Sequence, residues 1–139
     1  MSAEVWDTYF KFCFERNPWD KLLSWYLYYY KTSKLNGSIT DFIRSGRAGR
    51  NVGFDLYSIN GWPVVDRVYL FEEMEHALND ISKRIGLSQP LTLDGIHAKK
   101  GKRKSTNLRE VYTDQEIEMV RKMYAREIAF FGYDFPQTK

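Results

Sequence analysis

Residues 10–26 read FKFCFERNPWDKLLSWY, and this stretch decides how the chain folds. The aromatic run from Tyr9 to Glu15 has few polar interruptions, which is typical of a largely buried strand. A helix start follows directly, with Asn17 as N-cap and Pro18 at the first helical position. The stretch therefore predicts a strand that delivers Arg16 to the N-terminus of a helix running to about residue 31.

This junction has the composition of an anion site. Helix N-termini favour negative ligands, and the guanidinium of Arg16 presents a planar fork that pairs two phosphate oxygens at once. Ser24 lies seven residues after Asn17, two turns along and on the same helical face. An arginine between a strand and a helix is also common, and a polar-face serine is usually solvated. Spacing alone leaves the two interpretations open.

The aromatic residues near this junction also have two possible roles. Trp19, Trp25, Tyr28 and Tyr29 offer rings that stack on a nucleotide base, or they pack in the core or at an interface.

The sequence of the middle of the chain predicts a short helix and two short strands. A short helix is expected near residues 39–43, followed by a basic loop that carries Arg44, Arg47 and Arg50. Residues 55–59 and 64–70 predict two strands around the turn Asn60-Gly61.

The remainder predicts two longer helices. Apolar residues recur at helical spacing over 71–85, and Gly86 stands where a C-terminal glycine belongs. Residues 88–106 lack periodicity and carry the basic run of 99–104, which predicts an exposed loop. The final helix opens with the capping box Thr113/Glu116 and closes at Gly132. The order is α/β in character, with an incomplete sheet and a mostly helical C-terminal half.

Composition sets further bounds. The 139 residues suit one domain spanning 1–139, and the net charge of +3 argues for a local anion site and against a surface that coats nucleic acid. Cys13 is the only cysteine, so no internal disulfide or multi-cysteine metal site is expected, and the two histidines lack metal-type spacing. The longest uncharged stretch is far below the ~20 residues of a membrane span. A cytoplasmic location is the expectation.

The string Arg16-Asn17-Pro18-Trp19-Asp20, with Ser24 and Tyr26, resembles the 3′-phosphate motif of carbohydrate-type sulfotransferases. These enzymes use PAPS (3′-phosphoadenosine 5′-phosphosulfate). The segment from Val65 to Leu87 is similar to the family's central strand and helix, and residues 112–135 resemble its C-terminal signature. The resemblance implies a partial P-loop-like, three-layer α/β fold.

By this resemblance, Arg16 and Ser24 are ligands of the 3′-phosphate of PAPS. Lys100 and Gly101 are implied as contacts from a basic loop that closes over the nucleotide. The implied reaction transfers a sulfuryl group to a hydroxyl acceptor, most plausibly of a carbohydrate, and leaves the bisphosphate PAP. The family places its donor loop and its catalytic base upstream of the motif. Fifteen residues precede Arg16 and none forms such a loop, so the catalytic residues stay unknown.

Several alternatives stay open. The chain is a truncated or split product of an enzyme, or its missing half comes from a separate chain, or it is a degenerate relative that binds PAP or another nucleotide without turnover. A small basic nucleic-acid-binding module, using the arginines of 44–50 and the run of 99–104, is a further alternative. The incomplete sheet also predicts self-association or a partner chain.

Overall fold

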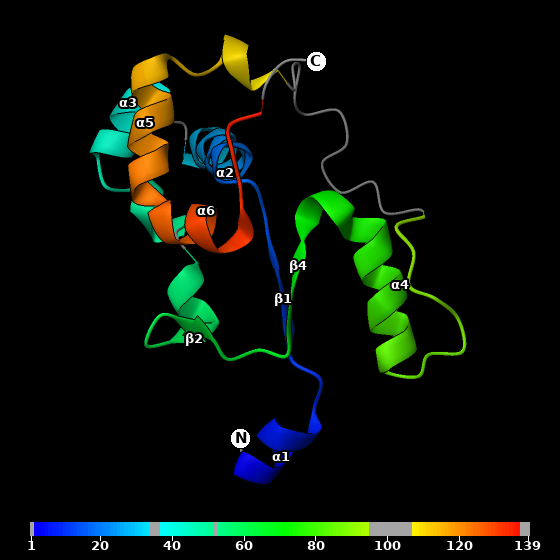
Figure 1. The fold of residues 1–139 in the computed structure, drawn as a ribbon. Coiled ribbons are helices and arrows are strands. Elements are labelled where there is room, and N and C mark those ends of the chain that lie inside the picture. Colours follow the sequence, from blue (N-terminus) through cyan, green and yellow to red (C-terminus); the bar gives the residue numbers. More distant parts are fainter. Residues whose placement is uncertain (1, 34–36, 52, 95–106, 137–139) are drawn as a thin grey trace. The chain divides into compact units, whose positions relative to one another are not determined.

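The structure is a computed structural model that describes residues 2–33, 37–51, 53–94 and 107–136. It is of the predicted mixed α/β class, with helices and short strands distributed along the chain (Figure 1). Its contacts divide the chain into two compact units. Unit 1 comprises Met1–Glu15 and Tyr57–Lys100, and unit 2 comprises Arg16–Leu56 and Gly101–Lys139. We describe each unit by itself, and the single domain stays a prediction.

Unit 1 is built on two parallel strands, β1 (Phe12–Glu15) and β4 (Arg67–Leu70). Phe12 lies opposite Arg67 and Glu15 opposite Leu70. The register is fixed at its start, where the Asp66 carboxylate accepts a hydrogen bond of 2.7 Å from the backbone N–H of Lys11. The predicted strand at 9–15 is therefore confirmed over Phe12–Glu15, but the prediction that it is largely buried is wrong, because Phe12 is 40% exposed and only Glu15 is buried.

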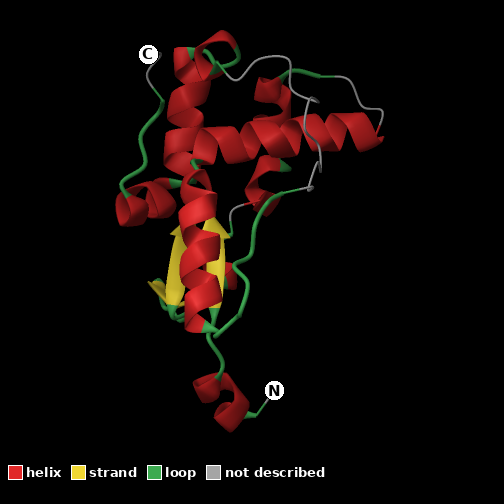
Figure 2. Cartoon of the chain, turned by 90° about the vertical axis from the view of Figure 1, so that its right-hand side faces the viewer, coloured by secondary structure: helices red, strands yellow, loops and turns green. Residues whose placement is uncertain are grey.

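Helix α4 (Met74–Arg84) covers one face of this strand pair (Figure 2). It follows a short 3-10 turn, η3 (Phe71–Glu73). Gly86, just beyond the C-cap Ile85, has a φ of 71°, the predicted left-handed conformation. Ala77 and Ile81 are buried against Tyr69 of β4. The apolar stripe predicted over 71–85 is too long, because the residues at its two ends, Phe71 and Ile85, are 44% and 48% exposed.

A tight hairpin precedes β4 and corrects one prediction. Strand β2 (Ser58–Ile59) pairs antiparallel with β3 (Trp62–Pro63), not with the run at 64–70. Asn60 and Gly61 both have positive φ, 53° and 79°, as a two-residue primed turn requires. Val64 still donates its N–H to the carbonyl of Tyr57 at 2.8 Å, but the later residues of the predicted strand leave the hairpin because Arg67–Leu70 pairs with β1.

An additional helix opens the chain. Helix α1 (Ala3–Thr8) begins after Ser2, whose hydroxyl accepts a hydrogen bond of 3.3 Å from the N–H of Val5. It contains no buried residue. A helix with no apolar stripe leaves no periodic signal in the sequence, so periodicity does not predict it.

Unit 2 is helical and has its own core. Its α-helices are α2 (Pro18–Ser33), α3 (Ile39–Arg44), α5 (Asp114–Met123) and α6 (Ala125–Phe131), labelled in Figure 1. Three 3-10 turns, η1 (Ala48–Asn51), η2 (Phe54–Leu56) and η4 (Leu108–Glu110), connect them. Trp19, Leu22, Phe42, Val120 and Tyr124 are completely buried at its centre.

The C-terminal segment contains two helices where the sequence predicts one. The capping box Thr113/Glu116 and the terminal Gly132, with φ of 68°, are confirmed. The helix breaks at Tyr124, where φ is −109° and ψ is 29°. Burial of the Tyr124 ring in the core accompanies this break. Apolar spacing continues across it, so periodicity alone did not reveal the change of helix.

Within the described ranges, no helix is both long enough and apolar enough to cross a membrane.

Candidate functional site

The N-terminal turn of α2 positions Arg16, the first predicted site residue. Its guanidinium binds the carboxylate of Asp20, four residues on, with Nε donating to Oδ2 at 2.5 Å. Nη2 of Arg16 also forms an ion pair with the same oxygen. Both side chains are about one-quarter exposed, at 27% for Arg16 and 23% for Asp20. The guanidinium is therefore held beside the start of the helix and reachable from solvent.

Ser24, the second predicted ligand, lies on α2 and is exposed. It follows Pro18 by six residues, which places it about 9 Å along the helix axis from the first helical position. Within the described residues, its hydroxyl makes no hydrogen bond. The hydroxyl is thus available to a ligand that lies along the helix.

The beginning of α2 is fixed to the rest of unit 2 by hydrogen bonds of the residues around Arg16. The indole N–H of Trp19 donates to the carbonyl of Ile117 at 3.1 Å, and the hydroxyl of Tyr112 donates to the carbonyl of Trp19 at 2.8 Å. The amide of Asn17 donates to the carbonyl of Asp134 at 3.0 Å. The start of α2 is therefore a rigid element, which would limit the entropy lost by a ligand that binds there.

Trp19 does not stack on a base, contrary to one interpretation of the sequence. Its side chain is completely buried, with Phe135 edge-on at 5.6 Å between ring centroids and Arg121 over the ring at 5.3 Å. Trp19 is a core residue that supports the helix start. Its aromatic type was compatible with both roles, and only its burial distinguishes them.

The other aromatic side chains of α2 are more accessible. Trp25 stacks on Tyr28 with centroids 5.7 Å apart and an angle of 19° between the rings, and Tyr28 is 48% exposed. The guanidinium of Arg47 lies over the ring of Tyr29 at 5.5 Å. These rings form a half-exposed aromatic surface on the same helix as Ser24.

Glu15, which directly precedes Arg16, is engaged within unit 1. Only 1% of the residue is exposed, and its carboxylate accepts a hydrogen bond of 2.8 Å from the hydroxyl of Tyr57. The carboxylate therefore has a structural partner. Strand alternation permitted such an inward orientation, as expected for a residue of β1.

Lys100 and Gly101, the two further contacts implied by the resemblance, lie outside the described residues, as does the whole basic run of 99–104. Among the described residues, no group of three or more His, Cys, Asp and Glu side chains forms a metal site. The described part of the site thus consists of Arg16, two residues before α2, and Ser24 on that helix.

Two neighbouring side chains were not assigned a role from the sequence. Asp20 appears in the sequence analysis only as part of the motif, although its spacing of four residues from Arg16 is that of a helical ion pair. Lys21 shares the face of Ser24, and its ammonium lies 5.8 Å from the centroid of the Tyr124 ring. These residues add a counter-charge and a second cation close to the start of α2.

The arrangement offers groups that suit an anionic ligand. Arg16 supplies charge-assisted hydrogen bonds, Ser24 supplies a neutral donor, and the helix start supplies the positive end of its dipole. A proton-transferring group beside these donors is not assigned. These groups are of the kind that bind oxyanions, and binding itself stays a prediction.

Comparisons with known proteins give one informative relative. No family model matches the chain, and no solved structure matches it. An uncharacterized protein of Archaeoglobus fulgidus is 36% identical over 95 residues, which cover 66% of this chain and 79% of the relative. Identity of this extent is shared ancestry and not a chance match. The chain belongs to the same protein family as this archaeal protein.

Proposed function

We propose that this protein is a member of the PAPS-dependent sulfotransferases and binds the 3′-phosphate of the nucleotide with Arg16 and Ser24. The intact activity is transfer of a sulfuryl group from PAPS to a hydroxyl acceptor, most plausibly on a carbohydrate. The partial P-loop-like fold implied by the resemblance is part of this proposal. In it, Lys100 and Gly101 are additional contacts to the nucleotide.

The observation that supports the proposal is the pairing of Arg16 with the N-terminal turn of α2. A phosphate dianion placed there meets a guanidinium and the positive end of a 16-residue helix. Ser24 presents an exposed hydroxyl on the same helix. The Trp25–Tyr28 pair offers an aromatic surface for the nucleoside, since bases stack readily on half-exposed rings.

The role of the described residues in the reaction is to bind and orient. In sulfuryl transfer, the bond between sulfur and the bridging oxygen of PAPS breaks while a bond from sulfur to the acceptor oxygen forms. The acceptor proton passes to a base, and PAP leaves with the bridging oxygen. Arg16 and Ser24 hold the 3′-phosphate, which stays unchanged, so they contribute by fixing the position of the reacting end.

The proposal is tested by comparing ligands that differ in one phosphate. PAP carries the 3′-phosphate and 5′-AMP lacks it, so calorimetry with both isolates the contribution of that group. Charge-assisted hydrogen bonds are worth about 1.5–3 kcal/mol each, so PAP is expected to bind at least about tenfold more tightly. Equal affinity for the two nucleotides overturns the proposal.

A second measurement separates binding from turnover. Transfer of radiolabelled sulfate from PAPS to a panel of oligosaccharides supports the enzyme. Tight binding of PAP without transfer to any acceptor supports the non-catalytic nucleotide-binding alternative. A steep salt dependence combined with equal binding of PAP and unrelated nucleic acid supports the basic module.

A further inference from the structure

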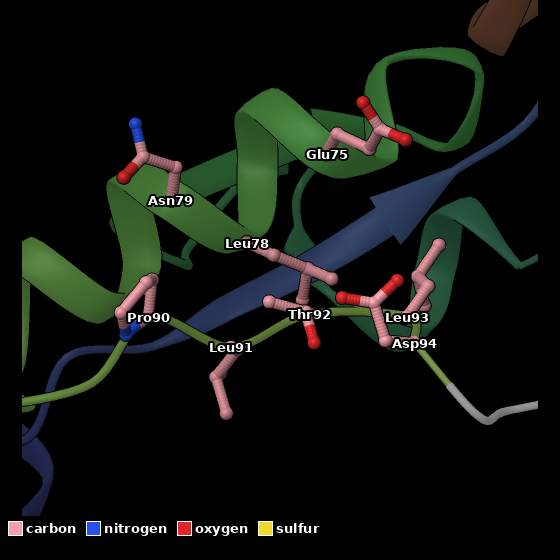
Figure 3. A pocket seen from close by; sticks show the side chains of 8 residues that line it. All are labelled: Glu75, Leu78, Asn79, Pro90, Leu91, Thr92, Leu93 and Asp94. Carbon is pink, nitrogen blue, oxygen red and sulfur yellow. The ribbon is translucent and has the colours of Figure 1, made fainter.

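A groove runs beside α4 in unit 1, whereas Arg16 and Ser24 belong to unit 2. One hollow of about 280 Å³ lies between α4 and residues 90–94 (Figure 3). A second hollow, of about 440 Å³, lies at the start of the helix. Glu75 and Leu93 line both hollows, so the two adjoin each other.

The wall of this groove is held by a buried polar contact. Ser82, only 2% exposed, accepts a hydrogen bond of 2.8 Å from the backbone N–H of Leu91. The same hydroxyl donates to the carbonyl of Leu78 at 2.6 Å. These bonds tie the segment after α4 back onto the helix, so the groove exists before any ligand arrives.

The groove has an apolar interior. Leu78 projects from α4 toward Thr92 of the facing segment (Figure 3). Met74 and Leu93 line the adjoining hollow, and Leu93 is 46% exposed. Half-exposed aliphatic side chains around a hollow favour an occupant with aliphatic parts.

Three carboxylates determine the charge of that occupant. Glu73, Glu75 and Asp94 line the groove, and no lysine or arginine is among its described lining residues. Compensation of the helix dipole explains acidic residues in the first turn of α4. It does not explain Asp94, which comes from the facing segment, nor the apolar hollow between the two.

We propose that this groove binds an extended basic segment of a partner protein, in which lysine or arginine alternates with aliphatic residues. Lysine and arginine lay their aliphatic stems on apolar surface while the charged head reaches a carboxylate, which matches an apolar interior with an acidic rim. Positions 72–79 extend over about 11 Å of helix axis, the length of three to four extended residues. The proposal concerns unit 1 and is independent of nucleotide binding.

The test uses the full chain and a labelled peptide, acetyl-Lys-Leu-Lys-Leu-Lys-amide, with its glutamate counterpart as the charge control. The basic peptide is expected to bind saturably, and the glutamate peptide is not. The double variant Glu75→Gln/Asp94→Asn should lose at least fivefold in affinity. Glu4→Gln/Asp7→Asn changes the net charge equally on exposed residues of α1 and should bind as the wild type does.

A further variant separates the groove from general electrostatics. Leu93→Asn keeps the charge and removes the aliphatic contact, and a severalfold loss of affinity is expected. Chemical-shift changes of backbone amides are expected at residues 72–79 and 90–94. Equal binding of the two peptides, equal effects of the two double variants, or shift changes confined to other residues would each overturn the proposal.

Discussion

The carboxylate of Asp20 pairs with the guanidinium of Arg16 at the start of α2, where Oδ2 accepts a hydrogen bond of 2.5 Å from Nε. The residue proposed to bind the 3′-phosphate therefore already holds an internal anion. A phosphate dianion shares or replaces this contact when it binds, since it carries more charge and more acceptor oxygens. Asp20 thus orients Arg16 and also weakens its attraction for an external anion.

Substitution Asp20→Asn tests this balance. The amide keeps an oxygen that accepts from the guanidinium but removes the negative charge next to the ligand. We expect the affinity for PAP to rise about threefold, a modest effect because both side chains are partly exposed and screened. Calorimetry of the variant measures it. A clear loss of affinity would mean that orientation by Asp20 outweighs its repulsion.

Trp19 supports the site from the core, so its substitution should destabilise unit 2. Trp19→Phe removes the indole N–H that bonds the carbonyl of Ile117 and reduces the buried volume. We expect the free energy of unfolding to fall by about 2 kcal/mol. Trp62→Phe, at a residue that is 71% exposed, should change it by less than about 0.5 kcal/mol. Denaturant titration compares the two, and equal effects would contradict the structural role.

Gly132 ends α6 in a left-handed conformation, with φ of 68°. A methyl group there meets no heavy atom within 4 Å, so the cost of Gly132→Ala is conformational alone. We expect a loss of about 1 kcal/mol. Gly49→Ala is the control, because that glycine has equal space and no positive φ. A melting temperature unchanged in both variants would show that the left-handed turn is not required.

Glu116 makes the stability of unit 2 sensitive to acid. Burial opposes its ionisation, yet hydrogen bonds from Thr40 and Thr113 keep the pKa of Glu116 below its ordinary value of 4.5. A group with a lowered pKa in the folded state stabilises it above the ordinary value, and the stabilisation is lost as the pH falls through the folded pKa.

The variant Glu116→Gln should therefore be less stable than the wild type at pH 7, by about 1 kcal/mol. The difference should shrink as the pH falls below 4.5. Unfolding measured from pH 7 to pH 3 follows this convergence, with Asp7→Asn on the exposed helix α1 as the control. Parallel curves for the wild type and Glu116→Gln at all pH values would refute it.

Local signals predicted most elements near the candidate site. Asn17-Pro18 correctly marks the start of α2, and Thr113/Glu116 marks that of α5, because capping depends on the residues themselves. The left-handed glycines at 86 and 132 were identified for the same reason. Arg16 was placed at the start of its helix by neighbouring residues alone.

Features that depend on distant residues were not predicted. The parallel pairing of β4 with β1 joins residues 55 positions apart. The turn signal at Asn60-Gly61 instead favoured a local hairpin between residues 55–59 and 64–70. Burial decides the role of Trp19, and burial follows from packing by Ile117 and Phe135. The groove beside α4 depends on the contact of Ser82 with Leu91, for which no local pattern exists.

The most direct test of the central claim is PAP binding by calorimetry at moderate salt, with wild type, Arg16→Ala and Arg50→Ala compared after circular dichroism shows that all three are folded. Arg50 is an exposed arginine of η1 and matches the charge change. The account predicts saturable binding that Arg16→Ala abolishes and Arg50→Ala leaves within about twofold. Absence of binding by the folded wild type, or equal losses in the two variants, would contradict it.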